Sequence, residues 1–201
     1  MLEGKTIAVI GGSGKLGSAL AGRWTKAGLT VIIGSRSGTP NAQAAAQADI
    51  VVVTVPYAAQ ADTLAEIAPH CRGKIVVDTT VPLMPPKVAR VQLPPEGSAA
   101  VRAAGLLEGA TVISAFHNVA AHKLATEEDV ECDCLVFGDV REARNAGVAL
   151  ARAAGLRGLH GGALANSAAA EALTSVLIFL NKTYQIDGGG IRITGTFTDP
   201  D

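Results

Sequence analysis

The stretch TIAVIGGSGKLG, residues 6–17, contains the pattern that decides the fold. Thr6–Ile10 is a short apolar run rich in β-branched residues, which favours a strand. The run ends at a glycine-rich turn, and a helical pattern begins at Lys15. A strand, a glycine turn and a helix in this order are the context in which G-x-G-x-x-G binds the pyrophosphate of a dinucleotide. The sequence therefore predicts a dinucleotide site at the start of the chain.

Each glycine of the motif has its own expected role. Gly12 allows the tight turn, Gly14 lets the backbone approach the pyrophosphate, and Gly17 lets the helix pack close to the strand. Free N–H groups at the start of the helix favour the negative charge of the ligand. A glycine-rich turn without a ligand is the alternative, but the complete strand–turn–helix context favours binding.

The end of the second predicted strand, Thr30–Ile33, indicates which dinucleotide binds. NAD-selective sites place an acidic residue there to hold the ribose 2′-hydroxyl. Here the chain reads Gly34-Ser35-Arg36-Ser37, without a carboxylate. Arg36 can pair with a 2′-phosphate and Ser35 can donate a hydrogen bond to it. The sequence therefore favours NADP(H) over NAD(H).

Strand and helix patterns alternate along the rest of the chain. Further strands are expected at 50–55, 74–78, 111–115 and 135–137, and helices at 15–27, 42–48, 58–68, 98–107, 142–154 and 166–180, with Ser98 and either Asn166 or Ser167 as N-caps. Such alternation predicts an α/β chain with a Rossmann-type, doubly wound, mostly parallel sheet and a small C-terminal helical part. We expect an NADP-binding domain over residues 1–160 and a small part over residues 161–201 that covers the crevice.

Composition limits the classes of function. The chain has 201 residues, a net charge of −1 and no basic block, which argues against nucleic-acid binding. No uninterrupted apolar run reaches the roughly 20 residues of a membrane span, and the N-terminus lacks the pattern of a signal peptide. Three cysteines favour reduced thiols in the cytoplasm. The all-apolar segment 176–180 needs cover on every side, so we expect a homodimer.

Loops at the carboxyl ends of the strands should line one crevice. They are Thr54-Val55-Pro56-Tyr57, Thr79-Thr80-Val81-Pro82 and Phe116-His117-Asn118-Val119-Ala120-Ala121. The chain has no Ser-His-Asp order, no pair of catalytic carboxylates and no metal-ligand cluster. We therefore expect no catalytic side chain and no metal, which suits a reaction between two bound cofactors.

These residues also carry a family resemblance. The chain resembles the NADPH-dependent reductases of coenzyme F-420 (also written F420), or F-420H2:NADP oxidoreductases. The matching pieces are Gly11 to Gly17, Gly34-Ser35-Arg36, Asp49 to Pro56, Ser114 to Ala121, Asn166-Ser167 with Glu171 to Thr174, and Gly188 to Gly195. They cover nearly the whole chain, and the last three are more specific to the family than the first three.

The resemblance implies hydride exchange between the nicotinamide and the deazaflavin of coenzyme F-420. It implies that Ser13, Gly14, Lys15 and Leu16 hold the pyrophosphate, and that Ser35 and Arg36 hold the 2′-phosphate. It places Thr54, Val55 and Ala121 at the nicotinamide half, and His117 and Val119 beside the deazaflavin. One departure stands out: the connection from Arg36 to Ile50 is too short for the helix and strand that similar proteins carry there, and a further basic residue has no counterpart.

Two other functions remain open at the level of sequence. The same scaffold could serve an NADPH-dependent reductase of a flavin, FMN or FAD, or of another small acceptor. It could also serve a non-catalytic NADP-binding sensor, because the motif GGSGKLG occurs in such proteins. Turnover with each acceptor distinguishes the three.

Overall fold

The computed structural model describes residues 2–198. Its strands are β1 (Thr6–Ile10), β2 (Thr30–Gly34), β3 (Ile50–Val53), β4 (Ile75–Asp78), β5 (Thr111–Ser114), β6 (Asp133–Phe137) and β7 (Arg157–Gly162). Its helices are α1 (Lys15–Lys26), α2 (Asn41–Gln47), α3 (Tyr57–Ile67), α4 (Ala99–Leu106), α5 (Ala121–Leu124), α6 (Arg141–Ala153) and α7 (Ser167–Tyr184), with 3-10 turns at Ala68–His70 and Leu164–Asn166.

The strands form one sheet in the order β2-β1-β3-β4-β5-β6-β7. The first five strands in this order are parallel. β6 joins β5 in antiparallel pairing through Ser114 and Phe137, and β7 runs parallel to β6. The predicted α/β class and mostly parallel sheet are confirmed, while the reversal at β6 was not foreseen.

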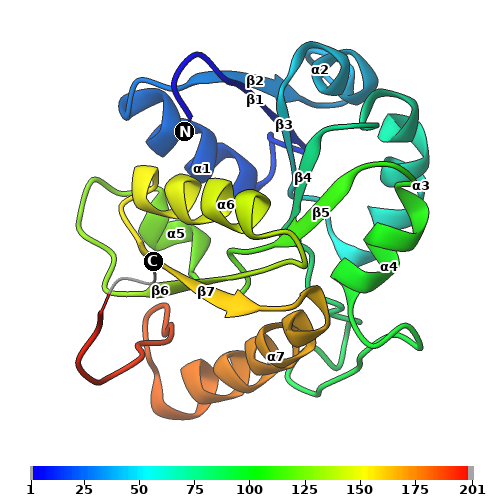
Figure 1. Cartoon of the computed structure of the whole chain (residues 1–201). Helices are drawn as coiled ribbons and strands as arrows, with labels where there is room; N and C mark the ends of the chain where they lie inside the picture. Colours follow the sequence, from blue (N-terminus) through cyan, green and yellow to red (C-terminus); the bar gives the residue numbers. More distant parts are fainter. Residues whose placement is uncertain (1, 199–201) are drawn as a thin grey trace.

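Helices cover both faces of the sheet, so the chain has two hydrophobic cores (Figure 1). Alternate residues of β1 point to opposite faces, as successive side chains of a strand do. Ile7 and Val9 belong to the core with α1 and α6, and Ala8 and Ile10 belong to the core with α2, α3 and α4. Both faces of β1 and β3 are therefore buried, which explains the continuous apolar runs in their sequences.

This topology determines the edge of the sheet at which a ligand can bind. The chain leaves β1 toward β2 on one side and returns to β3 on the other side of β1. The carboxyl ends of β1 and β3 thus form a switch point, where open α/β sheets bind ligands. The fold itself places the glycine turn and the residues after β3 at the same crevice.

The C-terminal part begins after β7, which continues to Gly162, and most of it is α7. Ser98 caps α4 as predicted, with Val101 N donating to its Oγ at 3.0 Å. The predicted side-chain cap of α7 is wrong. Asn166 is the last residue of the 3-10 turn, has a helical conformation and donates to Gly161 O, while the hydroxyl of Ser167 donates to Ser98 Oγ. The division at residue 160 into two domains stays a prediction.

The outer face of α7 is exposed in the single chain, with Val176 42% and Phe179 54% accessible. By length and composition alone, the helical stretch Leu164–Tyr184 could cross a membrane, a test that a packed helix of a soluble protein also passes. A third of that stretch is buried within the protein. The segment 176–180 is apolar on every side, and its own chain therefore leaves part of this apolar surface exposed.

Candidate dinucleotide and hydride-transfer site

The glycine turn is a tight loop between β1 and α1. Gly11 has a φ of +72°, a conformation that favours glycine, and Gly14 N donates to Gly11 O at 3.0 Å. Gly12 N donates to Gly34 O at 3.0 Å, so the turn is also tied to the end of β2. The residue of this turn that needs a positive φ is therefore Gly11.

Gly12 and Gly17 are required for close packing. A Cβ on Gly12 would lie 2.8 Å from Val9 O, and one on Gly17 would lie 2.6 Å from Thr54 Oγ1. Both distances are shorter than a carbon atom tolerates. A Cβ on Gly14 would meet only Gly11 O, at 3.3 Å, so the other side of Gly14 is open. This difference matches a ligand approaching the backbone at Gly14.

A cleft of about 700 Å³ begins at this turn. It is lined by Gly11, Ser13, Gly14, Lys15, Leu16, Ser35, Arg36, Asn41, Thr54, Val55, Pro56, Ala59, Thr63, Thr79, Thr80, Val81, Leu83, Phe116, His117, Val119, Ala121 and Thr174. The structure thus brings twelve of the fourteen predicted site residues to one cleft, and the other two are the packing glycines Gly12 and Gly17. Their contacts with cofactors stay a prediction.

The corner of the cleft after β2 contains the residues expected at the 2′-phosphate. Ser35 is buried, and its N–H donates to Thr39 O at 2.8 Å, while Arg36 is exposed at the rim. Between β2 and β3 the structure has one helix, α2, of seven residues. The short connection therefore contributes α2 to this corner of the cleft, through its first residue, Asn41.

Asn41, the first residue of α2, also lines this corner. Its Oδ1 is buried without a hydrogen-bond partner in the described part of the chain. A buried acceptor without a donor is costly, so this oxygen suits a ligand that offers a donor. A ribose hydroxyl or an adenine amino group has the required N–H or O–H. The residues present therefore fit a nucleotide.

The loop after β5 forms the opposite wall. Phe116 has a φ of +66°, an unfavourable conformation for a bulky residue, and it is buried with its ring edge-on to Trp24 at 5.9 Å. His117 follows, and its Nε2 lies 2.6 Å from Ser114 Oγ. Burial lowers the pKa of His117 to about 4, so the imidazole is neutral near pH 7. This residue is a neutral polar group in the wall of the cleft.

Helix α7 closes the same wall from the C-terminal part. Asn118 Nδ2 donates to Ala170 O at 2.8 Å, and Thr174 Oγ1 donates to His117 O at 3.0 Å. These bonds fix the loop after β5 against α7. They also bring Thr174 to the cleft, which explains why the family-like segment 171–174 matters to the site.

A buried polar network lies behind the cleft. Asp78 is fully buried at the end of β4 and accepts hydrogen bonds from Thr80 N and Oγ1, at 3.1 and 2.6 Å, and from Gln60 Nε2 at 2.6 Å. Asp78 therefore caps the turn that follows β4. Since Thr79 and Thr80 line the cleft, this carboxylate shapes its floor.

Glu171 of α7 belongs to the same network. Its two carboxylate oxygens accept from Ala99 N at 2.7 Å and from Ala100 N at 3.1 Å, at the start of α4. Burial raises the pKa of Glu171 to about 7, and the nearby charge of Asp78 adds to this effect. The carboxylate of Glu171 thus links α7 to the N-terminal end of α4.

Five cleft residues were missed by sequence reasoning: Asn41, Ala59, Thr63, Leu83 and Thr174. Ala59 and Thr63 lie one turn apart on α3, directly after the predicted loop 54–57, so helical spacing is a signal that was available. Thr174 belongs to a segment that the family resemblance had singled out. Asn41 and Leu83 follow turns whose course the sequence does not reveal.

The three cysteines do not line the cleft. Cys71, Cys132 and Cys134 are buried and free, and burial raises the pKa of Cys71 to about 11 and of Cys134 to about 12. Such thiols are protonated at neutral pH and unreactive. Within residues 2–198, no group of three or more His, Cys, Asp or Glu residues is arranged to hold a metal ion.

Comparisons with known proteins agree with this site. Residues 37–82 match a family model described as "NADP oxidoreductase coenzyme F420-dependent". The chain is 40% identical over 218 residues to the F-420-dependent NADP reductase of Methanothermobacter thermautotrophicus, covering 94% of each protein. It is 35% identical over 219 residues to the enzyme of that name from Methanocaldococcus jannaschii, covering 94% of this chain and 97% of the relative.

The fold has a solved counterpart. A crystal structure from Arthrobacter sp. FB24 superposes with a TM-score of 0.81 and 23% identity, over 96% of this chain and all of that one. The fold is of the Rossmann type, and its cleft lies at the switch point where such sheets bind dinucleotides. Because of its identity to the curated relatives over nearly its full length, the chain belongs to the family of F-420-dependent NADP reductases.

Proposed function

We propose that this protein transfers a hydride between NADP(H) and coenzyme F-420, the reaction of its family. The observation that carries the proposal is the single cleft that joins the glycine turn, the Ser35–Arg36 corner and the loop after β5. When both are bound, the nicotinamide C4 and the deazaflavin C5 supply the chemistry of hydride donation and acceptance. The protein binds, orients and shields the reacting groups.

The nucleotide half of the proposal assigns the turn and the corner after β2. The backbone N–H groups of Ser13, Lys15 and Leu16 face the pyrophosphate at the start of α1, which has no acidic residue in its first turn. Gly14, whose own N–H donates to Gly11 O, lets the ligand approach the backbone because it has no Cβ. Arg36 pairs with the 2′-phosphate, and Ser35 donates to it. Asn41 Oδ1 accepts from the adenosine half, which satisfies its buried oxygen.

The hydride-transfer half of the proposal lies between β3 and the loop after β5. Thr54, Val55 and Pro56 form one side, and Val119 and Ala121 form the other. Apolar side chains exclude water from the reacting carbons, which favours direct transfer over side reactions. His117 stays neutral there, with its Nε2 2.6 Å from Ser114 Oγ, and contributes a polar group to the wall of the cleft.

Anaerobic spectrophotometry with purified protein tests the choice of acceptor. The design uses NADPH as donor and F-420, FMN and FAD as parallel acceptors, and repeats the F-420 arm with NADH. Turnover with F-420 and a preference for NADPH are expected. Turnover with a flavin alone would replace the proposal with a flavin reductase, and tight NADPH binding without turnover for any acceptor would indicate a sensor.

We propose further that the protein acts as a homodimer in the cytoplasm. The support for the dimer is the exposed apolar face of α7, together with Ile186, Ile193 and Phe197 of the tail, which are 43–45% accessible. Burial of such a face is favourable by about 25 cal/mol per Å². The support for the cytoplasm is the set of three buried, unpaired cysteines.

A further inference from the structure

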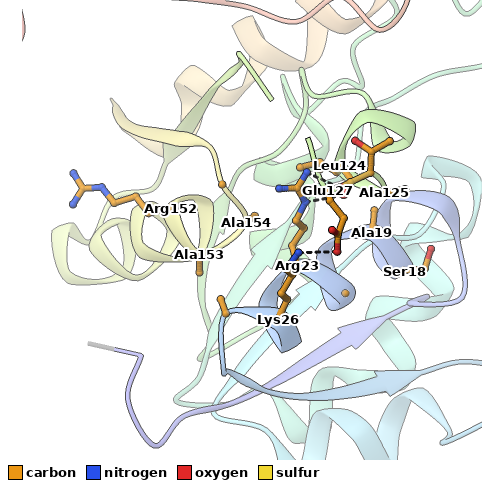
Figure 2. Close-up of a pocket in the computed structure, with 14 residues that line it drawn as sticks. Ser18, Ala19, Arg23, Lys26, Leu124, Ala125, Glu127, Arg152, Ala153 and Ala154 are labelled. Carbon is orange, nitrogen blue, oxygen red and sulfur yellow. Dashed lines mark hydrogen bonds and ion pairs between the residues drawn. The ribbon is translucent and has the colours of Figure 1, made fainter. Parts of the chain in front are cut away.

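A second hollow, of about 600 Å³, lies between α1, α5 and the end of α6, away from the cleft (Figure 2). Two cations of α1 line it, one turn apart. Lys26 forms an ion pair with Glu127 at 2.7 Å in which both side chains are largely exposed, and such pairs contribute little. Arg23, in contrast, binds backbone carbonyl groups rather than a carboxylate.

The guanidinium of Arg23 binds three backbone carbonyls of one segment. Its Nε donates to Leu124 O at 2.9 Å, and its Nη2 donates to Thr126 O and to Glu128 O, both at 2.7 Å. These carbonyls belong to the C-terminal end of α5 and the turn after it, where helical carbonyls lack partners within the helix. Figure 2 shows Arg23 reaching from α1 toward Leu124 and Ala125. One side chain therefore holds residues 124–128.

Trp24, the next residue of α1, contacts the other end of the cleft wall that runs from the loop after β5 into α5. Trp24 packs edge-on against Phe116, and its Nε1 donates to Leu150 O at 2.9 Å. Phe116 precedes His117, and α5 begins at Ala121, so the cleft-lining residues 117–121 lie between the two contacts from α1. A four-residue helix such as α5 is not stable alone, so its position depends on the groups that hold its ends.

We infer that Arg23 is a positioning residue that fixes the α5 wall of the cleft relative to the nucleotide-binding helix. The N-terminal end of α1 faces the pyrophosphate, and its C-terminal end holds Phe116 and residues 124–128. The same rigid helix thus sets the distance between the two cofactors. Hydride transfer depends steeply on this distance, because a misplacement of about 1 Å can cost roughly a hundredfold in rate.

This inference rests on the proposed placement of Val119 and Ala121 beside the nicotinamide and the deazaflavin. The opposite side of the loop is held independently by Thr174 of α7, whose Oγ1 accepts from Asn118 Nδ2 and donates to His117 O. At the surface, the exposed His122 and the half-buried Lys123 of α5 contact the exposed Asp187 at 2.8 and 2.5 Å. Loss of Arg23 should therefore loosen α5 on its α1 side without releasing the whole loop.

Arg23→Lys is the test variant, because lysine keeps the charge but cannot reproduce the planar fork that binds three carbonyls. Lys26→Ala, from the same helix and the same hollow, is the matched control. The measurements are kcat and KM with F-420, the Kd for NADPH from fluorescence titration, and amide hydrogen exchange of residues 119–128. The exchange rates of the Leu124 and Ala125 amides report directly on α5, because these amides donate to Ala120 O and Ala121 O.

For Arg23→Lys we expect kcat to fall about ten- to a hundredfold, the Kd for NADPH to stay within about twofold, and exchange of residues 119–128 to accelerate. Lys26→Ala should change none of these. Unchanged exchange over 119–128, or an equal loss of NADPH affinity and kcat, would overturn the positioning role. If the wild type fails to reduce F-420, the proposed function is wrong, while the exchange and NADPH measurements still decide the role of Arg23.

Discussion

At the end of β2, the exposed guanidinium of Arg36 lies beside the buried Ser35 and the unpaired oxygen of Asn41. In this proposed 2′-phosphate corner, Arg36 is the positively charged residue among those that line the cleft between β2 and β3. The short connection to β3 contains one helix, α2, whose first residue, Asn41, carries no charge. Selectivity for NADP(H) over NAD(H) should therefore depend on one side chain.

We predict that Arg36→Ala weakens NADPH binding by about 1.5–3 kcal/mol, the cost of a lost charged hydrogen bond, and leaves NADH binding nearly unchanged. Calorimetric titration with each cofactor measures both effects. Arg141→Ala, an exposed arginine of α6 outside the cleft, is the control and should affect neither. An equal loss for NADPH and NADH would show that Arg36 does not contact the 2′-phosphate.

Substitutions at two glycines of the turn should distinguish an effect on stability from an effect on NADPH binding. Gly17→Ala places a carbon 2.6 Å from Thr54 Oγ1 and should destabilise the protein by about 1–3 kcal/mol, as overpacking does. Gly14→Ala meets only Gly11 O at 3.3 Å, so it should leave thermal stability nearly intact and abolish most NADPH affinity. Thermal unfolding with and without NADPH measures both variants. A stable Gly14→Ala protein with normal NADPH binding would remove the pyrophosphate from this turn.

Several features of single residues follow from sequence, and others do not. The glycine turn and the place of Arg36 in the cleft could be predicted because both depend on neighbours along the chain. The positive φ of Phe116 could not, because tertiary packing against Trp24 imposes a conformation that a phenylalanine disfavours locally. The contacts of Arg23 join residues about a hundred positions apart, and no local pattern indicates them.

At the scale of elements, α7 is joined to α4 by the buried carboxylate of Glu171. Its pKa in the folded protein, about 7, lies above its ordinary value of 4.5, so the folded state binds the proton more tightly than the unfolded state. Stability from this group is therefore fully present below pH 4.5 and is lost as the pH rises toward 7. Asp78 of β4 is the charged group that faces it.

Glu171→Gln removes this titration. We predict that the unfolding free energy of the wild type, relative to the variant, falls by about 3 kcal/mol as the pH rises from 4.5 through 7. Urea unfolding at a series of pH values provides the measurement. A difference between the two proteins that stays constant over this range would contradict the raised pKa of Glu171.

Most elements could be predicted because their apolar periodicity is strong, as in β1, β3 and α6. β7 was missed because its sequence, RGLHGG, is rich in glycine and lacks β-branched residues; only its pairing with β6 makes it a strand. α5 was missed because four residues carry no periodic signal. The antiparallel entry of β6 depends on the course of the loop 125–132, which the sequence does not specify.

For the whole molecule, the exposed face of α7 leads to a prediction about assembly. We expect the wild type to be a dimer by light scattering and Phe179→Asp, which places a charge on the 54% accessible position, to shift it toward the monomer. Leu106→Asp, at an accessible position of α4, is the control and should remain dimeric. A monomeric wild type would leave the apolar face of α7 without the proposed partner.

The central claim is that one cleft holds NADP(H) and coenzyme F-420 close enough for direct hydride transfer. The most direct test follows the hydrogen itself, with NADPH deuterated at the transferred C4 position, F-420 and purified protein under anaerobic conditions. Mass spectrometry of the products should find the deuterium at C5 of reduced F-420, retained in full in ordinary water. Turnover that leaves reduced F-420 without the label, or no turnover at all, would contradict direct transfer in this cleft.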